Sequence, residues 1–374
     1  MKLGYKSTVL GIIPNDWNTS KLKYIIKIGN GKDYKHLKSG DIPVYGSGGI
    51  IAYVNEYLFE GKTVGIGRKG NIDKPILLNG KFWTVDTLFY INEFIDVDVD
   101  FVYNLFQAIN WLKYNEATGL PSLSKNNILN IDFVCPPHHE QKIIASCLNT
   151  WDNGIDLQVK FIEIKENRLK ALTQQLLSGK KRLSGFTQNW KEVKLGSLFS
   201  ERNETKLENL PLLSIGQEGV YPQTDSNKRD ISNADKSKYK RIVPGDIGYN
   251  TMRMWQGRSA LSSLEGIVSP AYTILVPKYN VNPYYFSILF KTSKLTNLFW
   301  RNSQGLVEDT LNCKYKDFSK IKYYVPSFEE QNAIAEILKT AEKEIQLEKQ
   351  KLEELKEQKK GLMQQLLTGK VRLV

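Results

Sequence analysis

The sequence predicts an α+β fold, in which two globular α+β domains are separated by two long antiparallel α-helices that form a coiled-coil spacer with a pseudo-twofold internal repeat. Residues 136–183 align without gaps with residues 326–373, and 20 of these 48 positions are identical. The segments outside the two copies break into short β-type runs separated by Gly and Asn. We therefore expect a first domain over 1–136, a first helix over 137–185, a second domain over 186–326 and a second helix over 327–374.

Both aligned copies carry apolar residues that step by four and three, which is a heptad pattern. At 1.5 Å per residue, a helix of about 40 residues is ~60 Å long, and such a stripe needs a partner helix. Polar residues interrupt it at Gln158 and Lys165 in the first copy and at Glu348 and Lys359 in the second. The predicted helix-packing residues are Ile144, Leu148, Ile155, Ile162, Leu169, Leu172, Leu176, Ile334, Leu338, Ile345, Leu352, Leu355, Leu362 and Leu366.

The two helices also end alike, on "QQLLSGK" and "QQLLTGK". Gly179 and Gly369 stand where a helix C-cap is expected, and Pro136 and Pro326 precede the helix starts. Trp17 and Trp190 align in the related phrases "IPNDWNTSKL" and "FTQNWKEVKL", so the globular segments are related as well. Antiparallel pairing predicts that Val374 returns toward Met1.

The globular segments are expected to contain sheet and helix in both domains. Residues 42–91 include the runs "IPVY", "IIAYV", "KTVGIG", "PILLN" and "FWTVDTLFYI". The second domain has "LPLLSIG", "GDIGYN" and "IVSPAYTILVP", followed by a helical pattern near "NPYYFSILFKTSKLTNLFW".

The charge of the chain favours a polyanionic partner. The formal net charge is +12, and residues 186–326 alone hold 20 Lys and Arg against 13 Asp and Glu. Clustered cations bind phosphates by releasing counterions, so nucleic acid is the first candidate, with a merely solvated basic surface as the alternative. No apolar run approaches the ~20 residues of a membrane span, and we expect a cytoplasmic protein.

Motifs of catalysis and cofactor binding are incomplete. "GIGRKG" matches GxGxxG, but Pro75 lies in the segment where a dinucleotide site requires a helix. "EGKT" has Glu56 where a P-loop needs its first Gly, and "NPYY" lacks the second Pro of an adenine methyltransferase motif. The three Cys and three His show no metal-ligand spacing, so we expect no catalytic residue, no metal and no cofactor bound by this chain.

The sequence resembles the specificity subunits of type I restriction-modification enzymes. The resemblance rests on "VYGSGGIIAYVNEYLFEGKTVGIGRKGN" and "FWTVDTLFYI", on "SKYKRIVPGDIGYNTMRMWQG" and "GIVSPAYTILVP", and on the twin "EQ…QQLL[ST]GK" helices. It implies two target recognition domains that each recognise half of a split site in double-stranded DNA. It also implies that two methylation subunits, which use S-adenosylmethionine, dock on the helices, and that restriction subunits complete the complex.

Candidate DNA contacts lie in Gly-punctuated loops and basic runs, where Arg, Asn and Gln can pair with base edges and Lys with phosphates. Solvated-loop roles remain the alternative for each residue. The candidates in the first domain are Tyr45, Ser47, Arg68, Lys69 and Asn71. Those in the second are Lys228, Arg229, Lys238, Lys240, Arg241, Asn250, Arg253, Gln256 and Arg258.

Two other classes of function stay open at this point. The chain is alternatively a coiled-coil adaptor that joins two proteins without sequence-specific DNA binding. A fused methyltransferase or nuclease is the third hypothesis, but the sequence has neither a methyl-donor fingerprint nor a carboxylate-lysine constellation.

Overall fold

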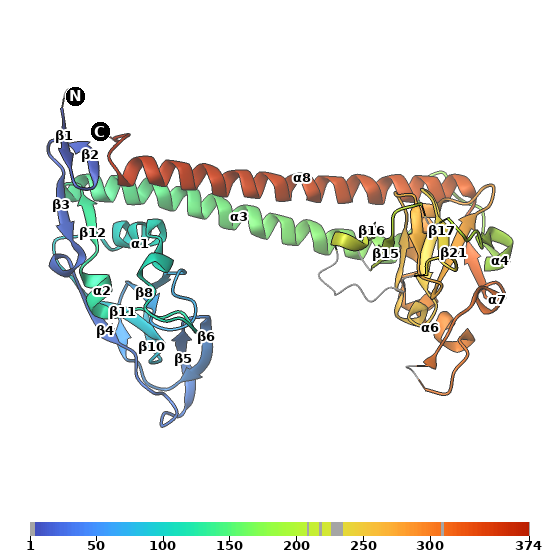
Figure 1. Cartoon of the computed structure of the whole chain (residues 1–374), viewed down its shortest axis with the longest axis horizontal. Helices are drawn as coiled ribbons and strands as arrows, with labels where there is room; N and C mark the ends of the chain where they lie inside the picture. The colour runs from blue at the N-terminus through green and yellow to red at the C-terminus, as the bar shows by residue number, and fades with distance from the viewer. Residues whose placement is uncertain (1–3, 208, 217–218, 226–234, 308–309, 374) are drawn as a thin grey trace. The chain divides into compact units, whose positions relative to one another are not determined.

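The structure, a computed structural model, describes residues 4–207, 209–216, 219–225, 235–307 and 310–373 (Figure 1). The chain divides into two compact units, unit 1 with Met1–Ile162 and Glu348–Val374, and unit 2 with Glu163–Leu347. The two longest helices, α3 (His138–Leu177) and α8 (Phe328–Leu367), contribute to both units because the division falls inside them. The domain limits expected from the sequence therefore stay a prediction. None of the described helices is long and apolar enough to cross a membrane.

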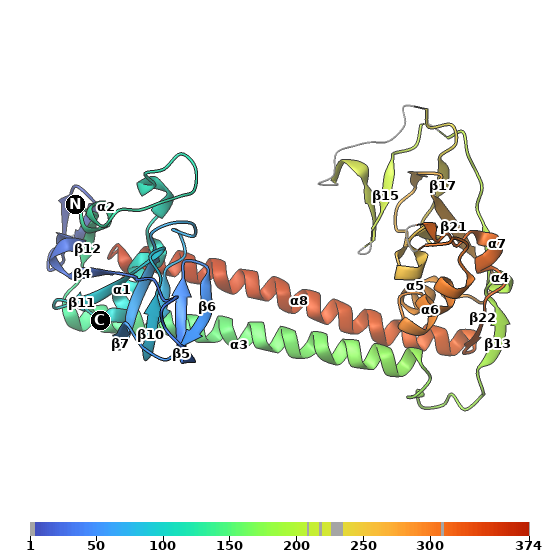
Figure 2. The same ribbon diagram turned by 90° about the horizontal axis from the view of Figure 1, so that it is seen from below.

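Unit 1 is built on two four-stranded sheets (Figure 2). One has the order β4-β11-β8-β9 (Ile26–Asn30, Leu88–Phe94, Thr63–Gly67 and Ile76–Leu78), and the other β6-β5-β10-β7 (Gly49–Val54, Ser39–Gly46, Lys81–Thr84 and Phe59–Glu60). Strand pairs β1-β2 (Tyr5–Thr8, Gly11–Pro14) and β12-β3 (Asp132–Cys135, Asn18–Lys21) and helices α1 (Val99–Ala108) and α2 (Lys125–Leu129) complete it.

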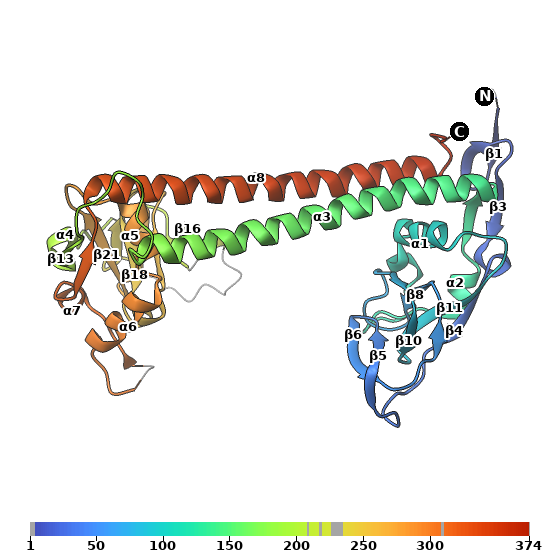
Figure 3. The same cartoon turned by 180° about the vertical axis from the view of Figure 1, so that it is seen from behind.

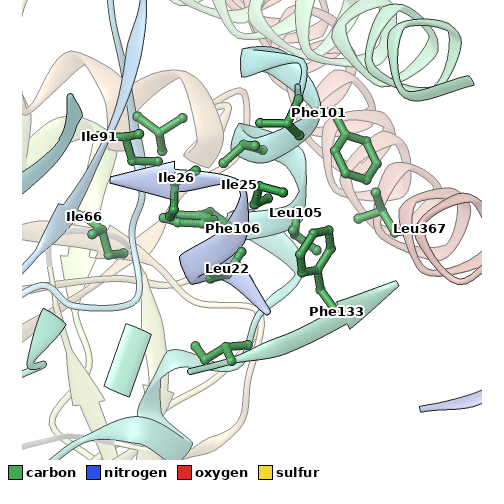
Figure 4. Close-up of a cluster of buried hydrophobic side chains, with 14 of the residues drawn as sticks. Leu22, Ile25, Ile26, Ile66, Ile91, Phe101, Leu105, Phe106, Phe133 and Leu367 are labelled. Carbon is green, nitrogen blue, oxygen red and sulfur yellow. The ribbon is translucent and has the colours of Figure 1, made fainter. Parts of the chain in front are cut away.

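The core of unit 1 joins its sheet to both long helices. Asp98 caps α1 by accepting a hydrogen bond from the Phe101 amide at 2.9 Å. Phe101 and Phe106 of this helix belong to one buried cluster with Ile26 and Ile91 of the sheet, and Figure 4 shows Phe106 beside Ile26. Leu367, from the C-terminal turn of α8, faces the same cluster (Figure 4). Unit 1 is therefore completed by residues that follow unit 2 in the chain.

The four-stranded sheet of unit 2, which includes the labelled strands β18 and β21 in Figure 3, has the same strand order as the β4-β11-β8-β9 sheet of unit 1. In unit 2 this sheet is β14-β21-β18-β19 (Phe199–Glu201, Tyr272–Pro277, Ile247–Asn250 and Ser259–Leu261). Its strand pairs are β13-β22 (Lys191–Lys194, Lys322–Val325), β15-β16 (Leu213–Ile215, Val220–Pro222) and β17-β20 (Lys240–Ile242, Gly266–Val268). Its short helices are α4 (Leu195–Leu198), α5 (Pro283–Leu289), α6 (Ser293–Asn302) and α7 (Tyr315–Phe318). The α+β repeat predicted from the sequence is thus confirmed in the globular segments.

Within each unit, α3 and α8 pack antiparallel. In unit 1, Asp152 pairs with Lys359 and Gln158 with Glu348, so one residue number rises as the other falls. In unit 2, Lys165 contacts Glu344 at 3.2 Å. Every apolar residue expected in the helix seam is buried or half-buried. Apolar residues at these seam positions therefore hold the two helices together within each unit.

The polar interruptions of the seam are paired with each other or with nearby side chains. Gln158 donates to the Glu348 carboxylate at 2.9 Å, and these two residues correspond in the repeat because their numbers differ by 190. Lys359 is almost fully buried and donates to Asp152 at 2.6 Å and to Gln107 of α1 at 2.9 Å. Unlike the apolar contacts, these polar contacts tolerate no change of register.

The repeated ends of the long helices take part in a polar cluster around a buried carboxylate in unit 1, which we call the first clasp (Trp17, Glu140, Arg372 and Asp16). Arg372 donates to both oxygens of the fully buried Glu140 at 3.0 and 2.7 Å. The Trp17 indole N–H donates to Glu140 at 2.8 Å, and Arg372 also binds Asp16 at 2.8 Å. The hydrogen bond from Arg372 lowers the pKa of the Asp16 carboxyl below its ordinary value.

A second clasp (Trp190, Glu330 and Arg182) has the same arrangement in unit 2. Arg182 donates to Glu330 at 2.7 and 2.8 Å, and the Trp190 indole donates to the same carboxylate at 3.2 Å. Gly179 and Gly369, which end α3 and α8, have φ of 71° and 68°, so the predicted Gly C-caps are confirmed. Met1 and Val374 lie outside the described residues. Arg372 nevertheless returns to Asp16 as antiparallel pairing requires.

Candidate nucleic-acid interface

The predicted contact loop of unit 1, residues 68–71, directly follows the fully buried strand β8. A side chain at Gly67 would collide with the Asn71 carbonyl, and Gly70 has a φ of 87°, so glycine is required for this tight turn. The Arg68 amide donates to the Thr87 carbonyl at 2.8 Å, and the Arg68 carbonyl accepts from the Leu123 amide at 2.9 Å. The loop is therefore fixed between the turn before β11 and the segment before α2.

The turn between β5 and β6 lies beside this loop. A Cβ added at Gly70 would lie 3.1 Å from the Ser47 hydroxyl oxygen, and one added at Gly48 would lie 3.8 Å from the Asn71 amide nitrogen. Lys69 and Asn71 are exposed. The structure thus brings Ser47, Lys69 and Asn71 together on one surface, where their donors can reach phosphates and base edges.

Arg68 and Tyr45 are placed less favourably for contact with DNA. The Arg68 guanidinium lies 5.9 Å from the centre of the Phe89 ring, and Arg68 is half-buried. The Tyr45 ring is half-buried and lies 6.3 Å edge-on from the buried Phe82 ring. Both side chains thus have partners inside unit 1, and their contact with DNA stays a prediction.

The predicted contact segment of unit 2, residues 250–258, starts at the last residue of β18, and its loop, residues 251–258, occupies the equivalent position after that strand. The Thr251 amide donates to the Ala271 carbonyl at 3.1 Å, and the Thr251 carbonyl accepts from the Cys313 amide at 2.9 Å. These two bonds match those of Arg68 in unit 1. The two loops that the sequence predicts as DNA contacts therefore occupy equivalent positions in the two units, after equivalent strands of sheets with the same strand order.

The side chains of this second loop differ in exposure. Asn250 is half-buried, and its side-chain oxygen accepts from the Met252 amide at 3.0 Å. Arg253 is half-buried and precedes the short 3-10 helix Met254–Gln256. Gln256 and Arg258 are exposed. Of the four predicted residues, these two are best placed for base contact.

In the basic run before β18, the two basic residues of strand β17 (Lys240–Ile242) are compensated by carboxylates. Lys240 binds Glu201 at 3.2 Å, whereas Arg241 binds Glu204 at 2.8 Å and Glu265 at 2.6 Å. Hydrogen bonds from Arg241, and then from Arg202, lower the pKa of Glu204. Lys238 is exposed, and Lys228 and Arg229 lie outside the described residues. A phosphate contact by this run stays a prediction, but Lys240 and Arg241 first have to leave their acidic partners.

One further cation near the first loop, Lys125, is not among the DNA contacts that the sequence predicts. Lys125 donates to the Ile28 carbonyl at 2.6 Å and lies over the same Phe89 ring as Arg68, at 5.7 Å. Desolvation and the charge of Arg68 lower the pKa of Lys125. The only sequence signal for it was the polar run "SKNN". Among the described residues, no three His, Cys, Asp or Glu side chains are grouped to hold a metal ion.

A family model described as Type I restriction modification DNA specificity domain matches residues 14–166 and 187–357. The type I restriction enzyme MjaVIII specificity subunit of Methanocaldococcus jannaschii is 26% identical, covering 96% of this chain and 94% of its own length.

Two solved structures have a similar fold. The type I restriction-modification S subunit of M. genitalium is 15% identical with a TM-score of 0.57, and the alignment covers 94% of this chain and 96% of that one. A chain from a structural study of complex assembly in the type I R-M system is 14% identical with a TM-score of 0.61, covering 96% and 99%. Both alignments therefore cover nearly the whole of this chain.

Proposed function

The chain belongs to the family of type I restriction-modification DNA specificity domains, and from this premise we propose that it is the DNA-recognition subunit of such an enzyme. The observation that carries the proposal is the equivalent position of residues 68–71 and 251–258 after β8 and β18. Twin loops on twin domains suit a bipartite site, with each loop contacting one half in the major groove. The adaptor hypothesis is not favoured, because the family is defined by DNA specificity.

The helical pair is proposed to fix the separation of the half-sites and to dock two methylation subunits. Leu157 and Phe161 of α3 are 66% and 44% exposed, and they lie one turn apart on the same helix face. Exposed apolar side chains at this spacing suit contact with a partner helix. We propose that catalysis, S-adenosylmethionine and restriction activity belong to partner subunits, and that the complex acts on DNA in the cytoplasm.

Methylation sequencing of whole genomes tests the proposed function. Cells that express this chain with its methylation subunits are expected to gain methylated adenines in one bipartite sequence, and cells without the chain are not. The purified complex should then bind that sequence ~10³-fold or more better than a scrambled duplex at the same salt concentration. Equal affinity for the two duplexes, or unchanged methylation, contradicts the proposal.

A matched pair of variants locates the contact. Arg258→Gln is expected to relax the sequence at one position of one half-site, because it removes the donor fork that pairs with guanine. Lys194→Gln makes the same charge change at an exposed position of β13, which belongs to a different sheet from β18 and β21, and should leave the recognised sequence unchanged.

A further inference from the structure

Unit 2 contains a cleft of about 670 Å³ whose lining is rich in cations. We call it the lysine cleft. Lys170 of α3 and Lys180 beyond its end line one part, and Lys291 and Lys294 at the junction of α5 and α6 line another. All four lysines are exposed, and the described residues that line the cleft include no Asp or Glu. An anionic group in the cleft therefore meets positive charge without a competing carboxylate in the lining.

The α5–α6 junction adds neutral donors to these charges. Thr292 is the N-cap residue of the ten-residue helix α6, but its hydroxyl donates to the Leu289 carbonyl at 2.7 Å and makes no cap bond to α6. The first-turn amides of α6 thus receive no side-chain acceptor from their N-cap residue. Ser293, exposed at the same turn, also lines the cleft. Lysines, hydroxyls and helix N-terminal amides are the groups that proteins use to contact DNA phosphates.

The lysine cleft adjoins the second candidate loop. Gly257 has a φ of 74°, and a Cβ added there would lie 3.3 Å from the Lys291 Cα and 3.2 Å from the Thr296 side chain. Gln256 and Arg258, which flank Gly257, are exposed. A duplex whose base edges meet these two side chains therefore has its backbone near the α5–α6 junction.

The position of unit 1 that corresponds to Lys291 has a neutral side chain. Asp98 and Asn282 are the N-cap residues of α1 and α5, and each accepts a hydrogen bond from the amide three residues later. Counting nine residues from each cap matches Gln107 of unit 1 with Lys291 of unit 2. Gln107 accepts from the buried Lys359, which also binds Asp152. Unit 1 thus has a neutral amide at this position, whereas unit 2 has an exposed lysine that lines the lysine cleft.

We propose that the lysine cleft binds the phosphate backbone of DNA beside the half-site contacted by unit 2. This inference rests on the proposed function and adds to it an asymmetric, sequence-independent contact. Lysine, a flexible point charge, suits such a contact, because phosphates position a protein on the duplex without carrying base information. The proposed phosphate contact also accounts for part of the excess of Lys and Arg over Asp and Glu in residues 186–326.

Salt dependence of DNA binding tests the proposal in the complete complex with methylation subunits. The test variant combines Lys170→Gln, Lys291→Gln and Lys294→Gln. The control variant has the same charge change at exposed lysines that do not line the cleft, Lys191→Gln, Lys194→Gln and Lys320→Gln. Affinity for the wild-type recognition sequence and for a scrambled duplex is measured by fluorescence anisotropy between about 50 and 200 mM salt.

The test variant is expected to reduce the slope of log affinity against log salt by about one for each lysine removed, and to keep the preference for the recognition sequence. The control variant should keep the wild-type slope. Each single-lysine variant gives about a third of the effect, so a folding defect of the triple variant does not hide the result.

Two outcomes overturn the inference. One is a wild-type slope in the test variant. The other is loss of the methylation subunits with an unchanged slope, which makes the cleft a protein-docking site. Neither affects the proposed function, which fails only if the wild-type complex itself shows no preference for a sequence.

Discussion

At the scale of single residues, the two clasps show how a buried charge is made tolerable. Glu140 and Glu330 have almost no exposed surface, and an unpaired carboxylate in such a place would be strongly destabilised. Each receives two donors from an Arg fork and one from an indole. Removing the Arg therefore lowers the free energy of unfolding by more than the contact itself contributes, because an unpaired carboxylate then remains buried.

Arg372→Ala is expected to lower the free energy of unfolding of unit 1 by ~3 kcal/mol, because it leaves the buried Glu140 without its cation. Urea denaturation followed by circular dichroism measures the change. Arg372→Lys should restore only part of the loss, since an ammonium cannot bind both carboxylate oxygens as a planar fork. The exposed neighbour Lys370 supplies the control, and Lys370→Ala should keep the wild-type midpoint. Equal midpoints for Arg372→Ala and the wild type contradict this account.

At the scale of elements, the pair of Gln158 and Glu348 sets the register of α3 against α8. An apolar seam alone packs almost equally well when it slips by one heptad, whereas a polar layer must meet its partner. Gln158 is buried and Glu348 half-buried, so a slipped register places a polar group against Leu or Ile. The hydrogen bond therefore contributes specificity more than stability.

Gln158→Leu alone is expected to destabilise the protein by about 1–3 kcal/mol, because the half-buried Glu348 carboxylate loses the hydrogen bond from Gln158. Adding Glu348→Leu should restore or raise the melting temperature, since the layer becomes apolar. Thermal denaturation of the two single variants and the double variant forms the cycle that separates these effects. If the loss of stability in the double variant equals the sum of the losses in the two single variants, Gln158 and Glu348 are not coupled.

The sequence predicted the elements better than their polar contacts. Heptad spacing identifies which face of each long helix is buried, because burial follows the helical period. It does not identify the partner of Lys359, because Asp152 and Gln107 lie outside the seam and far away in the chain. Residue types similarly predicted the loops at Arg68 and Arg253. They missed that Arg241 faces Glu204 and Glu265, which come from segments outside its own strand.

At the scale of the whole molecule, both globular segments repeat one sheet order, and both long helices run without a break through the division between the units. A flexible linker allows many separations of two sites, but a continuous helix of 40 residues allows few. The spacing between two half-sites should therefore matter as much as their sequences.

Insertion of five base pairs between the half-sites is expected to reduce specific affinity by ~10³-fold or more, to the non-specific level, because the second half-site then faces about half a turn away. Electrophoretic mobility shift with the complete complex measures it. A duplex with one scrambled half-site provides the reference for one-sided binding. Full affinity for the lengthened duplex means that the helical pair does not fix the spacing.

The contribution of α8 to unit 1 has a consequence for the order in which the protein is made. Unit 2 is one contiguous segment, Glu163–Leu347, and all its residues are available before the ribosome reaches Glu348. Unit 1 must wait for Leu366, Leu367 and Arg372, which fill its core and its clasp. During synthesis the segment that begins the chain therefore finishes folding last, and until then its apolar core is exposed to chaperones and proteases.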